Sequence, residues 1–197
     1  MPGHKISPRQ AARLDGLLRR LFLPWKDALK LAQPSKDENW ADLGCGPGFY
    51  TAPLARLART VHALDLEPAM VAMAAAKAGS LGLDNVHAQA CGEVALPLPD
   101  AAVHGVLLAF VAHEFSQPAD SLAEVARVLR PGGRALVVEF GEGALSIGPP
   151  AHHRIAPNQV LAWAELAGLA PGERHQWTRR LLGLPLVRLW AQVLCKP

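Results

Sequence analysis

The chain has 197 residues, half of them hydrophobic, and a formal net charge of +3. This length allows one ordinary globular domain and excludes a second full domain. No apolar run approaches the roughly 20 residues that cross a bilayer, and no apolar signal core follows the N-terminus, so we expect a cytoplasmic protein. The basic residues are scattered along the chain, so we expect no nucleic-acid partner.

The three cysteines, Cys45, Cys91 and Cys195, are widely spaced and include no CxxC pair. This spacing favours reduced thiols over a disulfide framework or a zinc cluster, and we expect no metal.

Two helices are predicted before the first strand. Leucines recur at intervals of three and four over residues 9–22, and a shorter helix is expected over 24–31. These helices either pack on the edge of a sheet or form a lid over bound ligands. The pattern does not choose between the two interpretations.

Residues 40–51 predict a strand, a tight loop and the start of a helix. Three glycines, Gly44, Gly46 and Gly48, alternate directly after the apolar strand. Glycine permits positive φ and lets a ligand approach main-chain amides, and the helix start adds unpaired N–H groups. A nucleotide-like ligand is therefore expected.

The spacing discriminates between nucleotides. A dinucleotide fingerprint places its third glycine three residues after the second, whereas Gly48 follows Gly46 by two, and Asp42 precedes the first glycine. An acid there repels phosphate but can accept a hydrogen bond from an ammonium group. S-adenosylmethionine has an ammonium group and no phosphate.

The run Asp42-Leu43-Gly44-Cys45-Gly46-Pro47-Gly48 resembles the glycine-rich motif of the class I S-adenosylmethionine-dependent methyltransferases. In that family the loop contacts the methionine part of the cofactor. The resemblance therefore implies that Asp42, Gly44, Cys45, Gly46 and Gly48 bind the cofactor. Cys45 is interpreted as a small loop residue and not as a nucleophile.

A second strand is predicted over residues 60–64 and ends at Asp65. An acid at this position of a nucleotide-binding α/β fold accepts hydrogen bonds from ribose hydroxyls, and the resemblance gives Asp65 the same role. Leu66 follows it, and Met70 stands in the next helix. Met70 either lines the adenine face or belongs to the core.

A third strand is predicted over residues 85–90. Relatives in the family usually carry an aspartate before the following Leu-Pro pair, and that aspartate receives the adenine amino group. Alignment on Leu96-Pro97 puts Gly92 at this position, with Glu93 adjacent. Either Glu93 substitutes for the aspartate, or backbone groups at Cys91 and Gly92 suffice.

The apolar run over residues 103–110 predicts a central parallel strand that is buried on both faces. Ala109, near its end, is expected beside the cofactor. The strand delivers His113 and Glu114 to the edge where open α/β sheets place ligands. His113 is the candidate base, with Glu114 orienting it or facing solvent, unless His113 only packs the strand end.

A helix is expected over residues 117–129, followed by a turn at Pro131-Gly132-Gly133 and a buried strand that starts at Ala135. The turn resembles the Leu-x-Pro-Gly-Gly turn that enters the fifth strand of the same methyltransferases. An irregular active-site loop is predicted over 141–150. Basic or titratable groups that could meet an anionic acceptor follow it, namely His152, His153 and Arg154.

The last predicted elements are a helix over residues 157–168 and strands over 172–178 and 187–194. The resemblance implies that the two strands form a hairpin, with one of them antiparallel to the rest of the sheet. The apolar stretch 181–190 could contact a second subunit, which leaves a homodimer open, although buried core is the better interpretation.

These elements predict an α/β fold: a Rossmann-like three-layer sandwich whose seven-stranded, mostly parallel sheet ends in a C-terminal antiparallel hairpin. We expect a single domain, with packing or lid helices over residues 1–34, a cofactor-binding core over 35–140 and an acceptor-side part over 141–197. The sequence is most similar to the small type 11 methyltransferases, a group that includes ubiquinone and menaquinone biosynthesis enzymes.

The resemblance implies S-adenosylmethionine as cofactor and direct in-line transfer of its methyl group to an unidentified small-molecule acceptor. Two other classes stay open. One is an NAD-dependent oxidoreductase, because Asp65 would suit that ribose too. The other is a non-catalytic protein that holds S-adenosylmethionine or its demethylated product.

Overall fold

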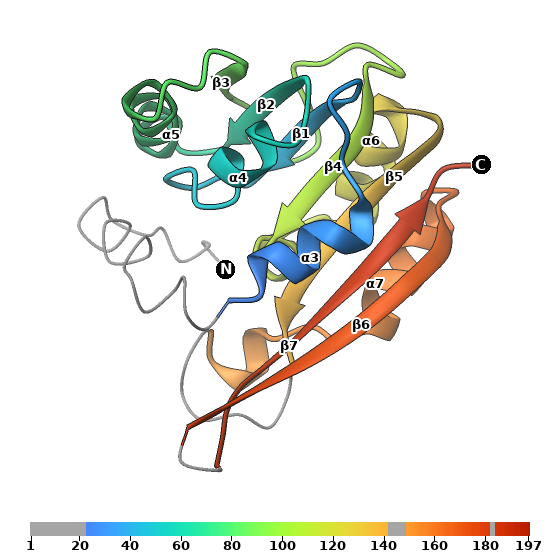
Figure 1. Ribbon diagram of the computed structural model, residues 1–197. Helices are drawn as coiled ribbons and strands as arrows, with labels where there is room; N and C mark the ends of the chain where they lie inside the picture. The colour runs from blue at the N-terminus through green and yellow to red at the C-terminus, as the bar shows by residue number, and fades with distance from the viewer. Residues whose placement is uncertain (1–22, 142–148, 182–183) are drawn as a thin grey trace.

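The structure is a computed structural model that describes residues 23–141, 149–181 and 184–197 (Figure 1). These residues form one seven-stranded sheet with the strand order β3-β2-β1-β4-β5-β7-β6. The strands are β1 (Asn39–Leu43), β2 (Thr60–Asp65), β3 (Val86–Ala90), β4 (Val103–Ala109), β5 (Leu129–Phe140), β6 (Ala170–Leu181) and β7 (Leu184–Cys195).

Helices cover both faces of the sheet (Figure 1). One face carries α3, α4 and α5, and the other carries α6 and α7, so the fold has three layers. The helical elements are α3 (Trp25–Ala32), α4 (Thr51–Ala55), α5 (Pro68–Ser80), α6 (Pro118–Val128) and α7 (Pro157–Leu166), with short 3₁₀ turns η1 (Ala112–Glu114) and η2 (Ala151–His153). The predicted three-layer α/β fold is confirmed.

Strands β1 to β5 run parallel, whereas β7 pairs antiparallel with both β5 and β6. The predicted C-terminal hairpin is therefore confirmed. Because β1 lies beside β4, the chain order reverses between these two strands. The carboxyl ends of β1 and β4 thus border the crevice in which open α/β sheets bind ligands.

The pairing of β1 with β4 depends on a glycine. Trp40 is fully buried and lies opposite Gly105 in the register of the two strands. A Cβ atom at Gly105 would lie 2.4 Å from ring atoms of Trp40. The indole therefore occupies space that only a residue without a side chain leaves open.

Arg134 joins β5 to the end of α3 and to the residue before β1. Arg134 of β5 contacts both carboxylate oxygens of Glu38 at 2.9 and 2.8 Å and donates to the carbonyls of Ala32 and Gln33 at the end of α3. Its guanidinium also lies 5.0 Å from the centroid of the Trp40 ring. Such a bidentate pair fixes orientation as well as charge, so α3 is held against the sheet.

Helix α3 corresponds to the second predicted N-terminal helix and buries Ala28, Leu29 and Ala32 in the same core cluster as Leu107 and Leu136 of the sheet. This helix packs on the face of the sheet against β5 and β7, and not on the predicted sheet edge; the lid interpretation stays a prediction. The first predicted helix, over residues 9–22, lies outside the described residues. Of the helices that the structure describes, none is long and apolar enough to span a bilayer.

Three strands extend beyond their predicted bounds. Strand β5 starts at Leu129 and not at Ala135, because Leu129 pairs with Val103 before the register shifts to Arg134 and Gly105. The predicted turn residues therefore lie inside an irregular strand, in which Gly132 has φ of +74°. The hairpin strands β6 and β7 are also longer than predicted, since each pairs with the other beyond the end of β5.

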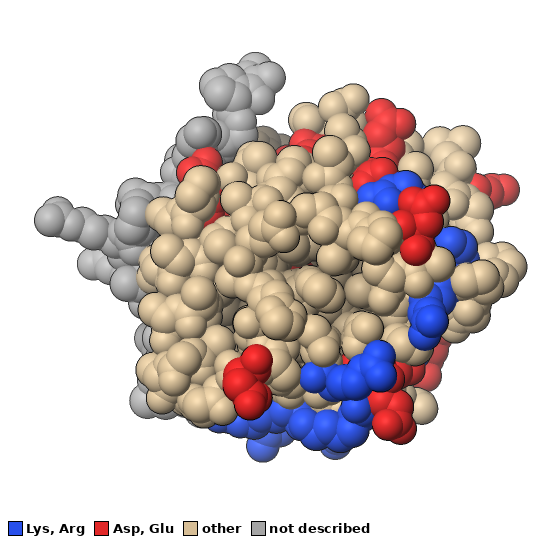
Figure 2. Space-filling model, turned by 90° about the horizontal axis from the view of Figure 1, so that it is seen from above, with Lys and Arg blue, Asp and Glu red and all other residues tan. Residues whose placement is uncertain are grey.

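Charges of both signs mix on the surface. Seen from above, Lys and Arg side chains lie among Asp and Glu side chains at the margins of a broad uncharged area (Figure 2). Arg127 pairs with Glu124 at 2.8 Å and with Asp100 at 2.7 Å. Neighbouring carboxylates thus neutralise part of the basic charge of the described residues.

We predict that Gly105→Ala lowers the free energy of unfolding by about 3 kcal/mol, because overpacking of a rigid core displaces the Trp40 ring. Gly79→Ala in α5 is the matched control, since its Cβ would meet nothing within 4 Å. It should raise stability by about 0.5–1 kcal/mol, as expected for glycine in a helix interior. Urea unfolding of both variants tests this pair, and equal effects would contradict the role of Gly105.

Candidate functional site

The glycine loop after β1 is held to the end of β2. The backbone N–H groups of Gly44 and Cys45 both donate to the Leu64 carbonyl, at 2.8 and 3.0 Å. All three loop glycines have positive φ: +71° at Gly44, +51° at Gly46 and +81° at Gly48. The loop thus adopts the glycine-dependent backbone that the sequence predicts.

The three glycines face different surroundings. A Cβ at Gly44 would lie 2.4 Å from the Val111 side chain, and one at Gly48 would lie 3.2 Å from the Ala74 backbone in α5. A Cβ at Gly46 would meet nothing within 4 Å. Gly44 and Gly48 therefore permit close packing of the protein on itself, whereas Gly46 faces open space that a ligand can enter.

Asp65, the last residue of β2, links this strand to the loop. Its carboxylate accepts hydrogen bonds from the N–H of Gly46 at 2.8 Å and from the N–H of Glu67 at 2.9 Å. Burial raises the pKa of Asp65, and these backbone hydrogen bonds offset only part of that rise. Each carboxylate oxygen keeps a second lone pair, so Asp65 can still accept two hydrogen bonds from a ligand.

Asp42 lies behind the loop. It is 1% exposed, and Thr51 Oγ1 donates to its carboxylate at 2.6 Å. Burial raises the pKa of Asp42 to about 7, helped by the charge of Asp65 and opposed by the Thr51 hydrogen bond. Cys45 is buried too, and burial raises the pKa of its thiol, which agrees with its interpretation as an unreactive loop residue.

The next strand ends beside Asp65. The Cys91 N–H donates to the Asp65 carbonyl at 3.0 Å, which brings the Gly92 segment close to this end of β2. Leu66 is 63% exposed next to Asp65, whereas Met70 is buried in the first turn of α5. The exposed Leu66 side chain and the buried Met70 side chain thus lie beside the candidate ribose site.

Glu93 is engaged elsewhere in the structure. Its carboxylate accepts hydrogen bonds from the hydroxyls of Ser116 and Ser121 and from the Gln117 N–H, at 2.8 to 3.1 Å. These donors lie at the start of α6, where a negative charge is favourable for a helix. The role of Glu93 toward adenine stays a prediction.

The end of β4 carries a strained residue among aromatic rings. Phe110 directly follows Ala109 and has φ of +60°, a conformation that costs energy for a bulky side chain. Its ring lies 4.6 Å from that of Phe140 and 6.2 Å from that of Tyr50, centroid to centroid. Phe110 and Phe140 are therefore half-buried rings at the ends of β4 and β5, packed beside the buried Tyr50.

His113 lies in the turn η1 and pairs with Glu139 of β5. Nδ1 of His113 is 2.9 Å from both carboxylate oxygens of Glu139. Burial alone lowers the pKa of His113, but the hydrogen bond and charge of Glu139 and the charge of Glu114 outweigh it, so the pKa is raised above 6.5. Glu114 is 52% exposed and 3.9 Å from Nε2.

Sequence analysis missed Glu139. The sequence does show an acid directly after the apolar run Ala135–Val138. This acid lies at the carboxyl end of the strand beside β4. Only the pairing of β5 with β4 brings it to His113.

The acceptor-side segment is partly described. Arg154 donates to the carbonyls of Pro149 at 3.1 Å and Gly141 at 2.9 Å, so it ties together the two ends of the predicted loop. Residues 142–148 of that loop lie outside the described residues. The rings of His152 and His153 pack edge to face, with their centroids 4.4 Å apart. Across the part of the chain that is described, no group of three or more His, Cys, Asp or Glu side chains could hold a metal ion.

Comparison with known proteins agrees with this geometry. Residues 41–137 match a family model described as a methyltransferase domain. Over these residues, just under half of its length, the chain is similar to this methyltransferase family. The matched residues run from β1 into β5 and include the glycine loop, Asp65 and His113.

Individual relatives carry the same kind of name. A demethylmenaquinone methyltransferase of Thermus thermophilus is 37% identical over 138 residues, which are 66% of this chain and 62% of that protein. A ubiquinone biosynthesis O-methyltransferase of a Caulobacter species is 29% identical over 140 residues, or 71% of this chain and 52% of that protein. The chain thus matches less than two thirds of the length of either relative.

A solved structure matches nearly the whole chain. The crystal structure of a SAM dependent methyltransferase from Aquifex aeolicus superimposes with a TM-score of 0.86 at 26% identity, and covers 98% of this chain and 100% of that one. The likeness therefore includes the hairpin and α7, which lie outside the matched family model.

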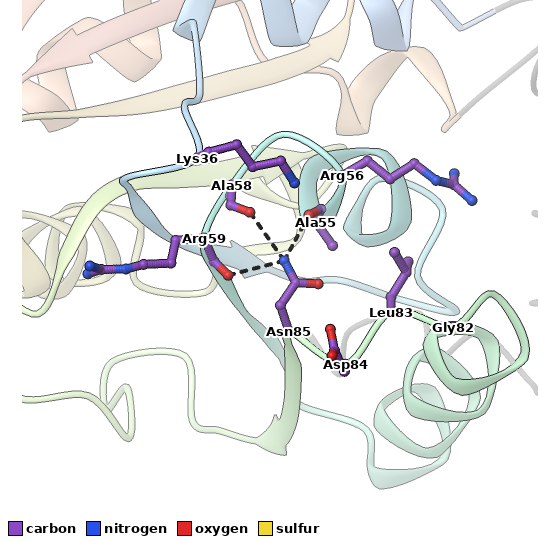
Figure 3. Close-up of a pocket in the computed structure, with 9 residues that line it drawn as sticks. All are labelled: Lys36, Ala55, Arg56, Ala58, Arg59, Gly82, Leu83, Asp84 and Asn85. Atoms are coloured by element: carbon purple, nitrogen blue, oxygen red, sulfur yellow. Dashed lines mark hydrogen bonds between the residues drawn. The ribbon is translucent and has the colours of Figure 1, made fainter.

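A hollow in the structure lies away from the glycine loop. It measures about 380 Å³ and is bordered by residues that precede β1, β2 and β3, at the amino ends of these strands (Figure 3). Within it, the Asn85 side-chain amide donates to the carbonyls of Ala55, Ala58 and Arg59 at 2.8 to 3.2 Å. Asn85 thus closes the exposed end of α4, which is a structural task.

We predict that Asp42→Asn stabilises the protein by about 4 kcal/mol above pH 7, because the pKa rises from 3.8 to about 7 and each raised pKa unit corresponds to about 1.4 kcal/mol. The folded state keeps the Asp42 proton up to about pH 7, whereas the unfolded state loses it near its ordinary value of 3.8. The free energy of unfolding of the wild type should therefore fall as pH rises from about 4 to about 7. The stability advantage of Asp42→Asn over the wild type should vanish near pH 4.

Denaturant unfolding at pH 5 and pH 8 measures this effect. Asp37→Asn, which removes the same charge at an exposed position, is the control. An equal gain for Asp42→Asn and Asp37→Asn at pH 8 would contradict the assigned burial cost.

Proposed function

We propose that this chain is an S-adenosylmethionine-dependent methyltransferase that acts on a small-molecule acceptor. The observation that carries the proposal is the open space at Gly46, bordered by the carboxylate of Asp65. Space free of side chains and a half-buried ribose acceptor suit a nucleoside ligand without phosphate groups, such as this cofactor. When bound, the cofactor supplies an electrophilic methyl group on a sulfonium centre.

Each part of the site has a proposed task. Gly44, Cys45, Gly46 and Gly48 hold the methionine part, and Asp42 supports that loop from behind through Thr51. Asp65 binds the ribose hydroxyls, with the adenine beside Leu66, Met70, Gly92 and Glu93. Ala109 borders the reacting methyl group, and His113 serves proton transfer at the acceptor, with Glu114 facing solvent beside it. Most of the rate would come from alignment of donor and acceptor in a site that excludes water.

The acceptor class is proposed from the relatives. The names of the Thermus and Caulobacter proteins both refer to quinone biosynthesis. The half-buried rings of Phe110 and Phe140 at the ends of β4 and β5 suit a flat aromatic acceptor, because aromatic rings stack favourably. We therefore propose a hydroquinone or a related phenol as acceptor. A cytoplasmic location, predicted from the sequence, belongs to the same proposal.

We predict that Asp65→Ala weakens binding of S-adenosylhomocysteine at least tenfold, because two hydrogen bonds to the ribose are lost. Transfer of a labelled methyl group to naphthohydroquinones and phenols should fall in parallel at limiting cofactor. Asp84→Ala, which removes an acid at the opposite edge of the sheet, is the control and should change neither quantity. Unchanged affinity in Asp65→Ala would discard the ribose assignment.

A further inference from the structure

Glu139 is a buried carboxylate with a defined set of partners. It is 1% exposed and stands next to the last residue of β5. A buried charge is costly unless it is paired and hydrogen-bonded. Among the described residues, Glu139 forms an ion pair with His113, whose side chain is 9% exposed.

The contacts fix the imidazole in one orientation. Besides the two contacts with His113 Nδ1, the carboxylate accepts from the His113 N–H at 3.2 Å and from the Phe140 N–H at 3.3 Å. An ionised carboxylate can only accept hydrogen bonds, so Nδ1 must carry the proton. In the neutral ring the free lone pair is then on Nε2.

The pair lies at the edge where the proposed reaction takes place. Phe110, which follows β4, donates its N–H to the Val138 carbonyl at 2.8 Å, so the ends of β4 and β5 are joined directly before Glu139. Val111 packs against Gly44 of the glycine loop, two residues before His113. The same short turn therefore contacts the candidate cofactor loop and carries the imidazole.

We propose that Glu139 is the positioning residue that makes Nε2 of His113 the general base of the reaction. This inference rests on the proposed function and adds that the acceptor gives up a proton, as a phenol or hydroquinone O–H or an acidic C–H does. As the acceptor atom bonds to the methyl carbon, its proton moves to Nε2, and the electron pair of the broken carbon–sulfur bond stays on sulfur. Charge is conserved, because the positive charge of the sulfonium ends on the imidazolium, which Glu139 stabilises.

Glu114 does not meet the same requirements. It lies beside Nε2, the nitrogen that must accept the proton, and is more than half exposed to solvent. Water screens such a contact, whereas the contact of Nδ1 with both carboxylate oxygens of Glu139 is buried. Glu114→Gln is therefore a matched control for Glu139→Gln, since each removes one negative charge near the same ring.

The experiment compares both variants in methyl transfer to a naphthohydroquinone over pH 5.5 to 9, with S-adenosylhomocysteine affinity measured in parallel. In Glu139→Gln we expect kcat on the plateau to fall at least tenfold and the acidic limb of the pH profile to move to lower pH, at unchanged affinity. Glu114→Gln should change kcat by less than about threefold. Glu139→Asp, which keeps the charge but shortens the side chain, should restore the position of the acidic limb.

A second readout needs no acceptor. Titration of the His113 ring by nitrogen-15 NMR, assigned with His113→Gln, should show a pKa above 6.5 in the wild type and a lower one in Glu139→Gln. An unchanged titration, or an unchanged kcat and pH profile with intact cofactor affinity, would overturn the inference and leave the proposed function standing. Failure of the wild type to bind S-adenosylhomocysteine would instead remove the proposed function, and the inference with it.

Discussion

The hydrogen bond from the Gly46 N–H to the Asp65 carboxylate joins the ends of β1 and β2, and the candidate cofactor site depends on it. It holds the loop in a conformation that only glycine adopts without strain, and it orients the carboxylate that faces the ligand. The site is thus built from two neighbouring strands before any ligand enters. Such preorganisation lowers the entropy that binding must offset.

A second contact, between His113 and Glu139, joins the ends of β4 and β5 beyond the point where the strand order reverses. His113 follows β4 and Glu139 ends β5, and their contact places a titratable ring on the other side of the glycine loop. The Trp40 indole packs over Gly105 and holds β1 against β4. The β1–β4 pairing therefore sets the position of the His113–Glu139 contact relative to the Gly46–Asp65 hydrogen bond. The stability of the core and the geometry of the site therefore have a common origin in the β1–β4 pairing.

Much of this arrangement could be predicted from the sequence, because the glycine spacing, Asp65 and the apolar run of β4 are local patterns. The role of Glu139 could not be predicted, because it depends on contact with His113, which follows another strand. The partners of Glu93 at the start of α6 and the early start of β5 are likewise results of tertiary pairing. Local patterns identified the elements, and the contacts between elements assigned their partners.

The glycine loop and Asp65 are proposed to bind the adenosyl cofactor of a methyltransferase. Calorimetric titration of the wild-type protein with S-adenosylhomocysteine, with NAD as the control ligand, tests this claim most directly. We predict one binding site with micromolar affinity for S-adenosylhomocysteine and no detectable heat with NAD. Binding of NAD alone, or of neither ligand, would contradict the account.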